Sequence, residues 1–458
     1  MDRDAIDLGT LHVPKLFRRY FIPTLFGMLS LSLVTVADGI FVGHGVGSDG
    51  IAAVNICIPI LMVFTGMALM VGVGSSVVAS IHLARGKKKV ARLTVTQALL
   101  FVSAVTVIPV LLILAFPSRV GLWLGASTHL LPMVRDYLVW LAPAMLFQMW
   151  TAVGLFVIRL DGAPRWAMWC SVSSALINLV LDWWFIFPLG WGVMGAAFAS
   201  AISIAVGGGM AMYYLFFKAM SVRLLLPKWS RKSLRLSLRN IGYQCRLGWS
   251  SFLGEATMAM LMFMGNLVFM KYLGDDGVGA FGIACYYTPF VFMVGNAIAQ
   301  SAQPIISFNY GAGNRSRTLK AQHTALGTAL LCGVLVTGAF VFFPEAMVGL
   351  FLRLSTPAAR IAVAGFPFYA AGFVCFILNL TVIGYYQSVE RASPATVFAL
   401  QRGLLFLVPS FLLLPKVLGT KGIWLAMPLS EGLTFLVIVA FFCSRTYRFR
   451  NGYGSHVL

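Results

Sequence analysis

Acidic residues are scarce in this sequence of 458 residues. Asp and Glu number 14 against 34 Lys and Arg, and charged residues together make up only 10% of the chain, against roughly 25% in an ordinary soluble domain. So few charges cannot cover the surface of a soluble protein of this length. The deficit argues against a soluble fold, and the 59% of hydrophobic residues, with a mean hydropathy of +0.88, indicates an integral membrane protein.

Several motifs are also missing. No C-x-x-C pair suggests a metal or redox site, because the seven cysteines lie one at a time in or beside apolar segments, where we expect them to act as packing residues. No G-x-x-x-x-G-K-[ST] loop occurs, which argues against an ATP-driven pump. The first sixteen residues hold three aspartates and no apolar stretch, so we expect no cleavable signal peptide and insertion through the first membrane helix.

Long apolar runs dominate what is present. Runs of about 20 apolar residues are long enough to cross about 30 Å of hydrocarbon. The sequence predicts twelve of them, at about 20–43, 51–80, 93–116, 134–158, 165–187, 194–217, 247–272, 279–303, 321–343, 362–387, 394–414 and 422–443. The connections between them are short and leave no room for a soluble domain.

The distribution of Lys and Arg predicts the orientation, because positive loops resist translocation. If the N-terminus is cytoplasmic, most of the 34 basic residues fall in loops on that side, including the basic segment 227–240. We therefore expect an inner (cytoplasmic) membrane protein with both termini in the cytoplasm. The net charge of +20 is spread over alternate loops, so it indicates topology and no nucleic-acid partner.

Landmarks recur along the chain at a constant offset of 227 residues. DGIAA at 49–53 reappears as DGVGA at 276–280, and Gly86 of ARGK reappears as Gly313 of AGNR. The same shift relates Pro188 to Pro415. Six spans are thus duplicated as six more, and because six is even, both halves keep one direction across the membrane.

The duplication predicts the fold class and the domains. We expect an all-α integral membrane protein with twelve transmembrane helices in two six-helix bundles, related by a pseudo-two-fold axis along the membrane normal. The bundles are expected at residues 1–217 and 247–458, joined by a basic cytoplasmic linker at 218–246. A cleft between two such bundles is where alternating-access transporters hold their cargo.

One polar set stands out in the first half. A charge at the bilayer centre costs about 2.5 to 3.5 kcal/mol, so Asp38 in SLVTVADGIFVG needs a partner, a proton or a function. With 1.5 Å of rise per residue, Asp38, Asp182 and Ser200 are all predicted roughly 8 to 9 Å below the outer ends of their helices. Asn178 lies one turn deeper on the face of Asp182.

Two aspartates in one dry pocket cannot both be ionised comfortably, so the pair is expected to titrate as a unit. The amide of Asn178 and the hydroxyl of Ser200 can hydrogen-bond either protonation state. The set therefore predicts a cation-coupling site. The alternative is a static polar knot that joins three helices.

Two more acids are predicted near the midplane of the second half, Glu255 and Glu431. A desolvated carboxylate attracts a cation strongly, so either can serve a cationic substrate or a second coupling ion. The alternative is that each is protonated or points into a wet cleft without a function.

The second half also offers a candidate substrate cleft. Met260 and Met264 share a helix face, and Tyr287 adds an aromatic ring, while Asn296 and Gln300 share a face of the next span. Thioethers and ring faces suit an apolar cation. Packing in the core or against lipid is the alternative for the apolar members of this set.

These residues and motifs resemble the multidrug and toxic compound extrusion (MATE) family. The resemblance covers the whole chain and rests on ADGIFVG followed by DGIAAVNICIP, on NLVLDWWFIFPLGWGVMGAAFAS (178–200) and on AQSAQPIISFNYGAGNRSR (299–317). It implies a cofactor-free, bilayer-embedded exporter that exchanges amphipathic, usually cationic or polyaromatic compounds for H+ or Na+. We expect such a protein to be a monomer.

The resemblance also implies site residues. The coupling site corresponds to Asp38, Asn178 and Asp182, with Ser200 at a position where a threonine is common, and Na+ is a possible ion there beside the favoured H+. Other members use a second-half sodium site with a glutamate that Glu255 matches. Their partner aspartate has no counterpart here, because the span 362–387 holds no carboxylate.

Three other functions remain alternatives. A flippase for lipid-linked oligosaccharides belongs to the same superfamily, but its anionic cargo calls for intramembrane Lys or Arg, and we expect scarcely any bases inside these bundles. An intramembrane aspartyl protease is a remote alternative, because its tyrosine-aspartate and G-x-G-D signatures are absent around Asp38 and Asp182. A passive channel also stays open at this point.

Overall fold

The computed structural model describes residues 8–225 and 230–450, and every regular element in these residues is helical. The elements are α1 (Val13–Gly45), α2 (Ser48–Ala84), α3 (Lys88–Ala115), α4 (Pro117–Trp123), α5 (Leu131–Leu160), α6 (Pro164–Ile186), α7 (Gly192–Tyr213), η1 (Tyr214–Lys218), α8 (Arg231–Gly311), α9 (Arg315–Phe342), α10 (Pro344–Gly349), α11 (Pro357–Ala370), α12 (Phe373–Ser388), α13 (Ala392–Leu400), η2 (Gln401–Leu405) and α14 (Leu407–Arg450). The short segments η1 and η2 are π-helical.

Nine helical stretches in the described residues are long and apolar enough to cross a membrane, and α11 with α12 forms a tenth crossing bent by 46°. Two of these stretches are long enough to contain two spans each. Gly274 in α8 and Gly419 in α14 have φ values of 63° and 60°, which glycine adopts without strain and which break each helix into two. The described residues thus provide the twelve spans that the sequence predicts.

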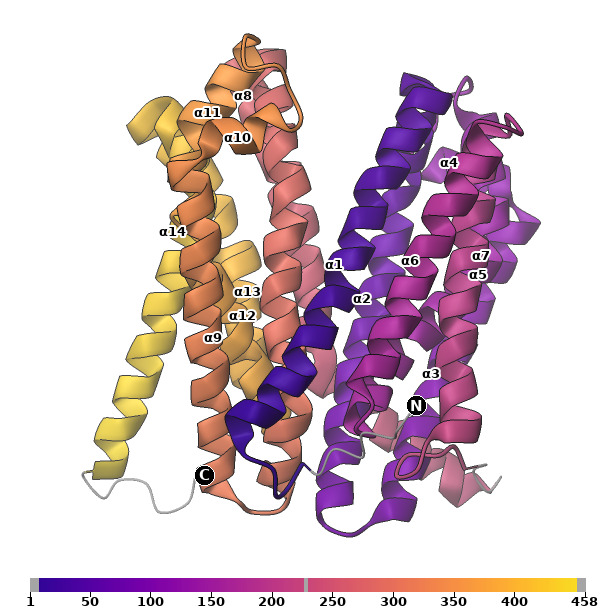
Figure 1. Ribbon diagram of the computed structural model, residues 1–458, viewed down its shortest axis with the longest axis vertical. Helices are drawn as coiled ribbons and strands as arrows, with labels where there is room; N and C mark the ends of the chain where they lie inside the picture. The colour runs from indigo at the N-terminus through magenta and orange to yellow at the C-terminus, as the bar shows by residue number, and fades with distance from the viewer. Residues whose placement is uncertain (1–7, 226–229, 451–458) are drawn as a thin grey trace. The chain divides into compact units, whose positions relative to one another are not determined.

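The chain forms two compact units. Unit 1 contains the described residues up to Glu255 together with Ala297–Ala325 and Tyr385–Ala392. Unit 2 contains Ala256–Asn296, Leu326–Gly384 and the described residues from Ser393 onward. Within unit 1, α1, α2, α3, α5, α6 and α7 pack side by side, as the indigo to magenta ribbons show (Figure 1).

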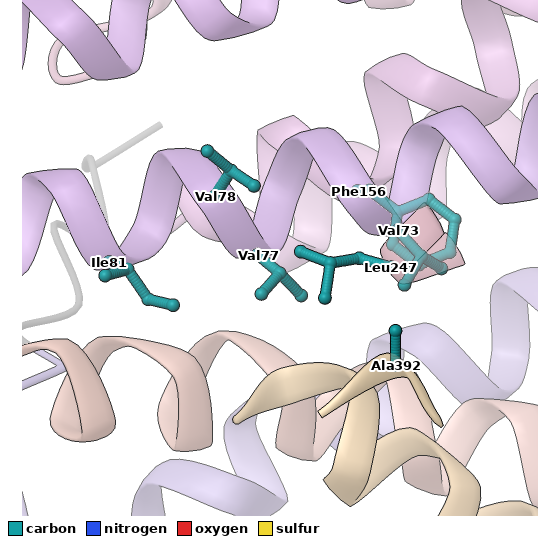
Figure 2. Close-up of a cluster of buried hydrophobic side chains, with 7 residues drawn as sticks. All are labelled: Val73, Val77, Val78, Ile81, Phe156, Leu247 and Ala392. Carbon is teal, nitrogen blue, oxygen red and sulfur yellow. The ribbon is translucent and has the colours of Figure 1, made fainter. Parts of the chain in front are cut away.

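An apolar core lies at one end of unit 1. Its α2 side chains include Val73, Val77 and Ile81, and Phe156 of α5 packs against them. Leu247 of α8 and Ala392 of α13 face the same cluster (Figure 2). Residues from both halves of the sequence therefore bury one another at the end where α2 and α5 finish.

Hydrogen bonds reinforce this end. Ser307 Oγ, near the end of α8, donates to Ser80 Oγ of α2 at 2.8 Å, and Arg159 of α5 donates to Gln300 Oε1 at 2.7 Å. All four residues are buried. A buried polar group that loses its partner costs about 1–3 kcal/mol, so these pairs hold the end of the unit in one register.

Glycine allows the backbones of α2 and α8 to approach closely at this end. A Cβ on Gly74 would meet the backbone of Gln244, and one on Gly248 would meet the carbonyl of Met70. Backbone atoms cannot move aside as the tip of a flexible side chain can. Because Gly74 and Gly248 have no side chains, residues 244–248 of α8 can pack directly against the backbone of α2.

Replacing Gly248 with alanine is expected to lower the free energy of unfolding by about 1–3 kcal/mol, because the added methyl group overpacks this contact. Thermal unfolding of the purified protein in detergent measures the effect. Gly242→Ala in the same helix is the matched control, since a Cβ there meets nothing within 4 Å. Equal unfolding temperatures for both variants would contradict the close packing.

Candidate functional site

The predicted acidic pair meets where α1 packs against α6. Asp182 is fully buried and Asp38 is half-buried. Their carboxyl groups are close enough for one to hydrogen-bond the other when a proton is present. Within the described chain, no donor reaches Oδ1 of Asp38 or either carboxylate oxygen of Asp182. The pair therefore lacks the donors that normally stabilise two buried negative charges.

The amide and the hydroxyl of the predicted set meet on the neighbouring helices. Asn178 Nδ2 of α6 donates to Ser200 Oγ of α7 at 3.3 Å. One turn earlier in α6, Ser174 Oγ donates to the carbonyl of Ser203 at 2.8 Å and forms a second link between these helices. Oδ1 of Asn178 is buried and accepts nothing from the described residues. Helices α1, α6 and α7 thus hold two adjoining polar pairs.

Tyr137 of α5 also belongs to this site, although the sequence did not single it out. Its side chain is 7% exposed and lies in the neighbourhood of Asp38 and Asp182. Aromatic residues are common in membrane spans, so periodicity alone gives no signal for it. A phenol can donate or accept a hydrogen bond, which makes Tyr137 a further polar candidate in this neighbourhood.

The site offers oxygen atoms that can bind and release a cation. Across the described residues no group of three or more His, Cys, Asp and Glu could hold a metal ion. Carboxylate, amide and hydroxyl oxygens remain, and they can take a proton or a hard cation. A single proton shared by the two carboxyls would turn their repulsion into a hydrogen bond.

The two acids of the second half lie in different surroundings. Glu255 is half-buried, and no described residue forms a hydrogen bond or an ion pair with it. Glu431 is 2% exposed, and its Oε1 lies 2.7 Å from Nη2 and 3.0 Å from Nε of Arg402. Asn379 Nδ2 donates to Oε2 of Glu431 at 2.8 Å. A guanidinium thus neutralises the carboxylate predicted as a cation site.

Arg402 is held by more than this ion pair. It lies in the π-helical segment η2, its backbone carbonyl accepts from Ser430 Oγ at 2.8 Å, and its guanidinium lies 4.4 Å from the ring centroid of Phe376. Its side chain is 1% exposed. The expectation of scarcely any bases inside the bundles is wrong here and at Arg159, which is 4% exposed. The sequence pattern does not predict that these two arginines are buried, because their partners Gln300 and Glu431 are distant in sequence.

The predicted cleft residues divide between the units. Gln300 belongs to unit 1, where it accepts from Arg159, while Met260, Met264 and Asn296 are half-buried in unit 2. Tyr287 packs its ring among Phe340, Phe351 and Phe366 and donates its hydroxyl to the carbonyl of Met347 at 2.9 Å. Such contacts are typical of a packing residue.

The spans with their buried acids define a multi-pass membrane protein, and the comparisons show which family it belongs to. The chain belongs to the MatE family, whose model matches twice, over residues 23–184 and 251–412. This is the family that the sequence motifs resemble. The double match also confirms the internal duplication and shows a transporter family, not a family of enzymes.

Several known proteins are similar over nearly their whole length. An FAD transporter of Shewanella oneidensis is 25% identical over 447 residues, which cover 94% of each chain. The multidrug export protein MepA of Staphylococcus aureus is 23% identical over 438 residues, 92% of each chain. Among solved structures, the outward-facing form of a multidrug resistance MATE family transporter has a TM-score of 0.89 at 23% identity and covers 98% of this chain and 100% of its own. The likeness confirms the predicted fold class.

Proposed function

We propose that this protein is a proton-coupled antiporter that exports amphipathic, cationic or polyaromatic compounds by alternating access. The observation that carries the proposal is the contact between Asp38 and Asp182, two carboxyl groups without other donors in the described residues. Asn178, Ser200 and Tyr137 complete the coupling site. We further propose a monomer in the inner membrane with both termini in the cytoplasm.

The geometry favours H+ over Na+ as the coupling ion. A proton needs only the two carboxyl oxygens that already face each other. A sodium ion needs further oxygen ligands. The unpaired Oδ1 of Asn178, one helical turn from Asp182, is the candidate for such a ligand. Na+ at Asp38, Asn178 and Asp182 is therefore the second choice.

The coupling can work through helix packing. With the proton bound, Asp38 and Asp182 join α1 to α6; without it, they repel and favour a different approach of the two helices. If proton binding lowers the affinity for the transported compound, linkage requires that the compound lowers the affinity for the proton by the same factor. Within unit 1, the apolar core around Val77 and the Arg159–Gln300 bond hold the ends of α2 and α5 against α8.

The relatives support two classes of cargo. The name of MepA supports multidrug export, and the acidic character of the site together with the unpaired, half-buried Glu255 suits cationic compounds. The second candidate is an anionic aromatic compound such as a flavin dinucleotide. It is favoured by the name of the Shewanella relative and by buried Arg159, whose Nε has no acceptor among the described residues.

Dye efflux from proteoliposomes tests the proposal. An ethidium-like cation and a flavin dinucleotide are loaded separately, and efflux is driven either by a pH gradient or by a sodium gradient. We expect the pH gradient alone to move the cation against its own concentration gradient, which a passive channel cannot do. Efflux that follows sodium alone would overturn proton coupling, and transport of the flavin alone would overturn the cationic cargo.

A further inference from the structure

The first turns of α8 are tied to α3. Gln97 Nε2 donates to Ser237 Oγ at 2.8 Å, and Asn240 Nδ2 donates to Gln97 Oε1 at 2.6 Å. Asn240 also reaches Thr94 Oγ1 at 3.4 Å. The basic segment that the sequence predicts as a linker is helical from Arg231 onward. The hydrogen bonds of Ser237 and Asn240 hold one face of this helix against α3.

The chain ahead of this helix is fastened as well. The carboxylate of Asp161 accepts from the backbone N–H groups of Met220, Ser221 and Val222 at 2.8 to 3.3 Å. Leu225 N–H donates to Thr96 Oγ1 at 3.0 Å. These bonds hold the approach to α8 against the ends of α5 and α3.

A stripe of arginines runs along the opposite face of the helix. At about 100° per residue, Arg231, Arg235 and Arg239 follow one another at i, i+4 and i+8, roughly opposite Ser237 and Asn240. All three arginines are exposed. With a rise of 1.5 Å per residue, the stripe extends over about 12 Å.

Apolar side chains border the stripe. Leu234 is 56% exposed and Leu238 is 59% exposed, and both lie on the side next to the arginines. An arginine stripe beside exposed leucines is typical of a helix that lies at the boundary between headgroups and acyl chains. The helix continues directly into an apolar span, which places this segment at the edge of the bilayer.

The charge on the stripe has no counterpart within the described chain. No carboxylate there forms an ion pair with Arg231, Arg235 or Arg239. Like charges at i and i+4 destabilise a helix, whereas an anion held between them removes the repulsion. The stripe is therefore complementary to a row of phosphate groups.

We propose that the face of α8 formed by Arg231, Leu234, Arg235, Leu238 and Arg239 binds the headgroups of anionic phospholipids. The arginines contact lipid phosphates, and the leucines contact the first methylenes of the acyl chains. The bound leaflet is the one at the end of unit 1 where α2 is followed by α3. The lipid then stabilises the part of α8 that packs against α2 at Gly74 and Gly248.

The test uses the full purified chain in detergent. Phosphatidylglycerol or phosphatidylcholine is added, bound lipid is counted by native mass spectrometry, and thermal unfolding is followed. We expect a salt-sensitive preference for phosphatidylglycerol that weakens about 100-fold in the variant Arg231→Gln, Arg235→Gln, Arg239→Gln. The variant Lys87→Gln, Lys88→Gln, Lys89→Gln removes the same charge from exposed positions at the start of α3 and is expected to retain the preference.

Several results would overturn the proposal: an unchanged preference in the arginine variant, an equal loss in the lysine variant, or equal stabilisation by inorganic phosphate at matched ionic strength. If the arginine variant fails to insert, Arg231→Lys, Arg235→Lys, Arg239→Lys keeps the charge. That protein is expected to prefer phosphatidylglycerol at low salt and to lose the preference at high salt. A preference that salt does not change would contradict the phosphate contacts.

Discussion

Replacing Asp38 with asparagine is expected to abolish gradient-driven efflux while the protein stays folded, because the variant can no longer bind and release the coupling proton at this pair. An asparagine amide would donate permanently to Asp182, whose two oxygens have no other donor in the described residues. It would imitate the proton-bound pair and prevent the cycle of binding and release. Efflux of a cationic dye from proteoliposomes under a pH gradient measures the effect.

The matched control is Asp49→Asn, which removes a carboxylate from an exposed position at the start of α2. Its efflux is expected to equal that of the wild type. Full efflux by the Asp38 variant, or an equal loss in both variants, would mean that the buried pair does not couple transport. Unfolding temperatures within a few degrees of wild type would show that the loss arises from coupling and not from misfolding.

Replacing Glu431 with glutamine is expected to lower the free energy of unfolding by about 3–5 kcal/mol, the usual effect of removing one partner of a buried ion pair. The reason is Arg402, which is 1% exposed and has no other carboxylate acceptor among the described residues. Its Nη1 already lacks a partner in that part of the chain. Unfolding in detergent, followed by heat or denaturant, measures the loss.

A double variant separates the ion pair from a cation site at Glu431. Arg402→Met with Glu431→Leu removes both charges, so its stability is expected to return close to that of the wild type. Glu255→Gln is the control for loss of a carboxylate that has no described partner, and little change in stability is expected. If Glu431→Gln leaves stability unchanged but abolishes transport, the acid is a cation site, as the sequence predicts, and the structural role is wrong.

Helix geometry explains why the sequence could predict that the polar residues of the first half lie near one another. The rise per residue fixes the depth of a side chain once the end of its span is known, which is how Asp38, Asp182 and Ser200 could be placed at one level. The side chain of Asn178 follows from the helical repeat. The structure brings these residues together in two pairs, and only Tyr137 escaped notice, because a buried tyrosine resembles any aromatic packing residue.

The second half was less predictable because its polar contacts join distant positions. Arg402 and Glu431 are 29 residues apart on different helices, and nothing in a hydropathy pattern pairs them. The bend at 371–372 and the early start of α8 at Arg231 depend on packing and hydrogen bonds that a single span does not encode. Met260 and Met264 also remain predictions, since apolar side chains suit a core, a cleft or lipid equally well.

Proton release on cargo binding tests the central claim most directly. The purified protein in weakly buffered detergent solution is mixed with a cationic dye, and the pH change is recorded over a range of starting pH values near neutrality. Reciprocal coupling predicts that the wild type releases protons as the dye binds and that Asp38→Asn with Asp182→Asn binds the dye without release. Equal release by both proteins, or dye binding by the wild type without any release, would contradict a shared proton at Asp38 and Asp182 as the coupling ion.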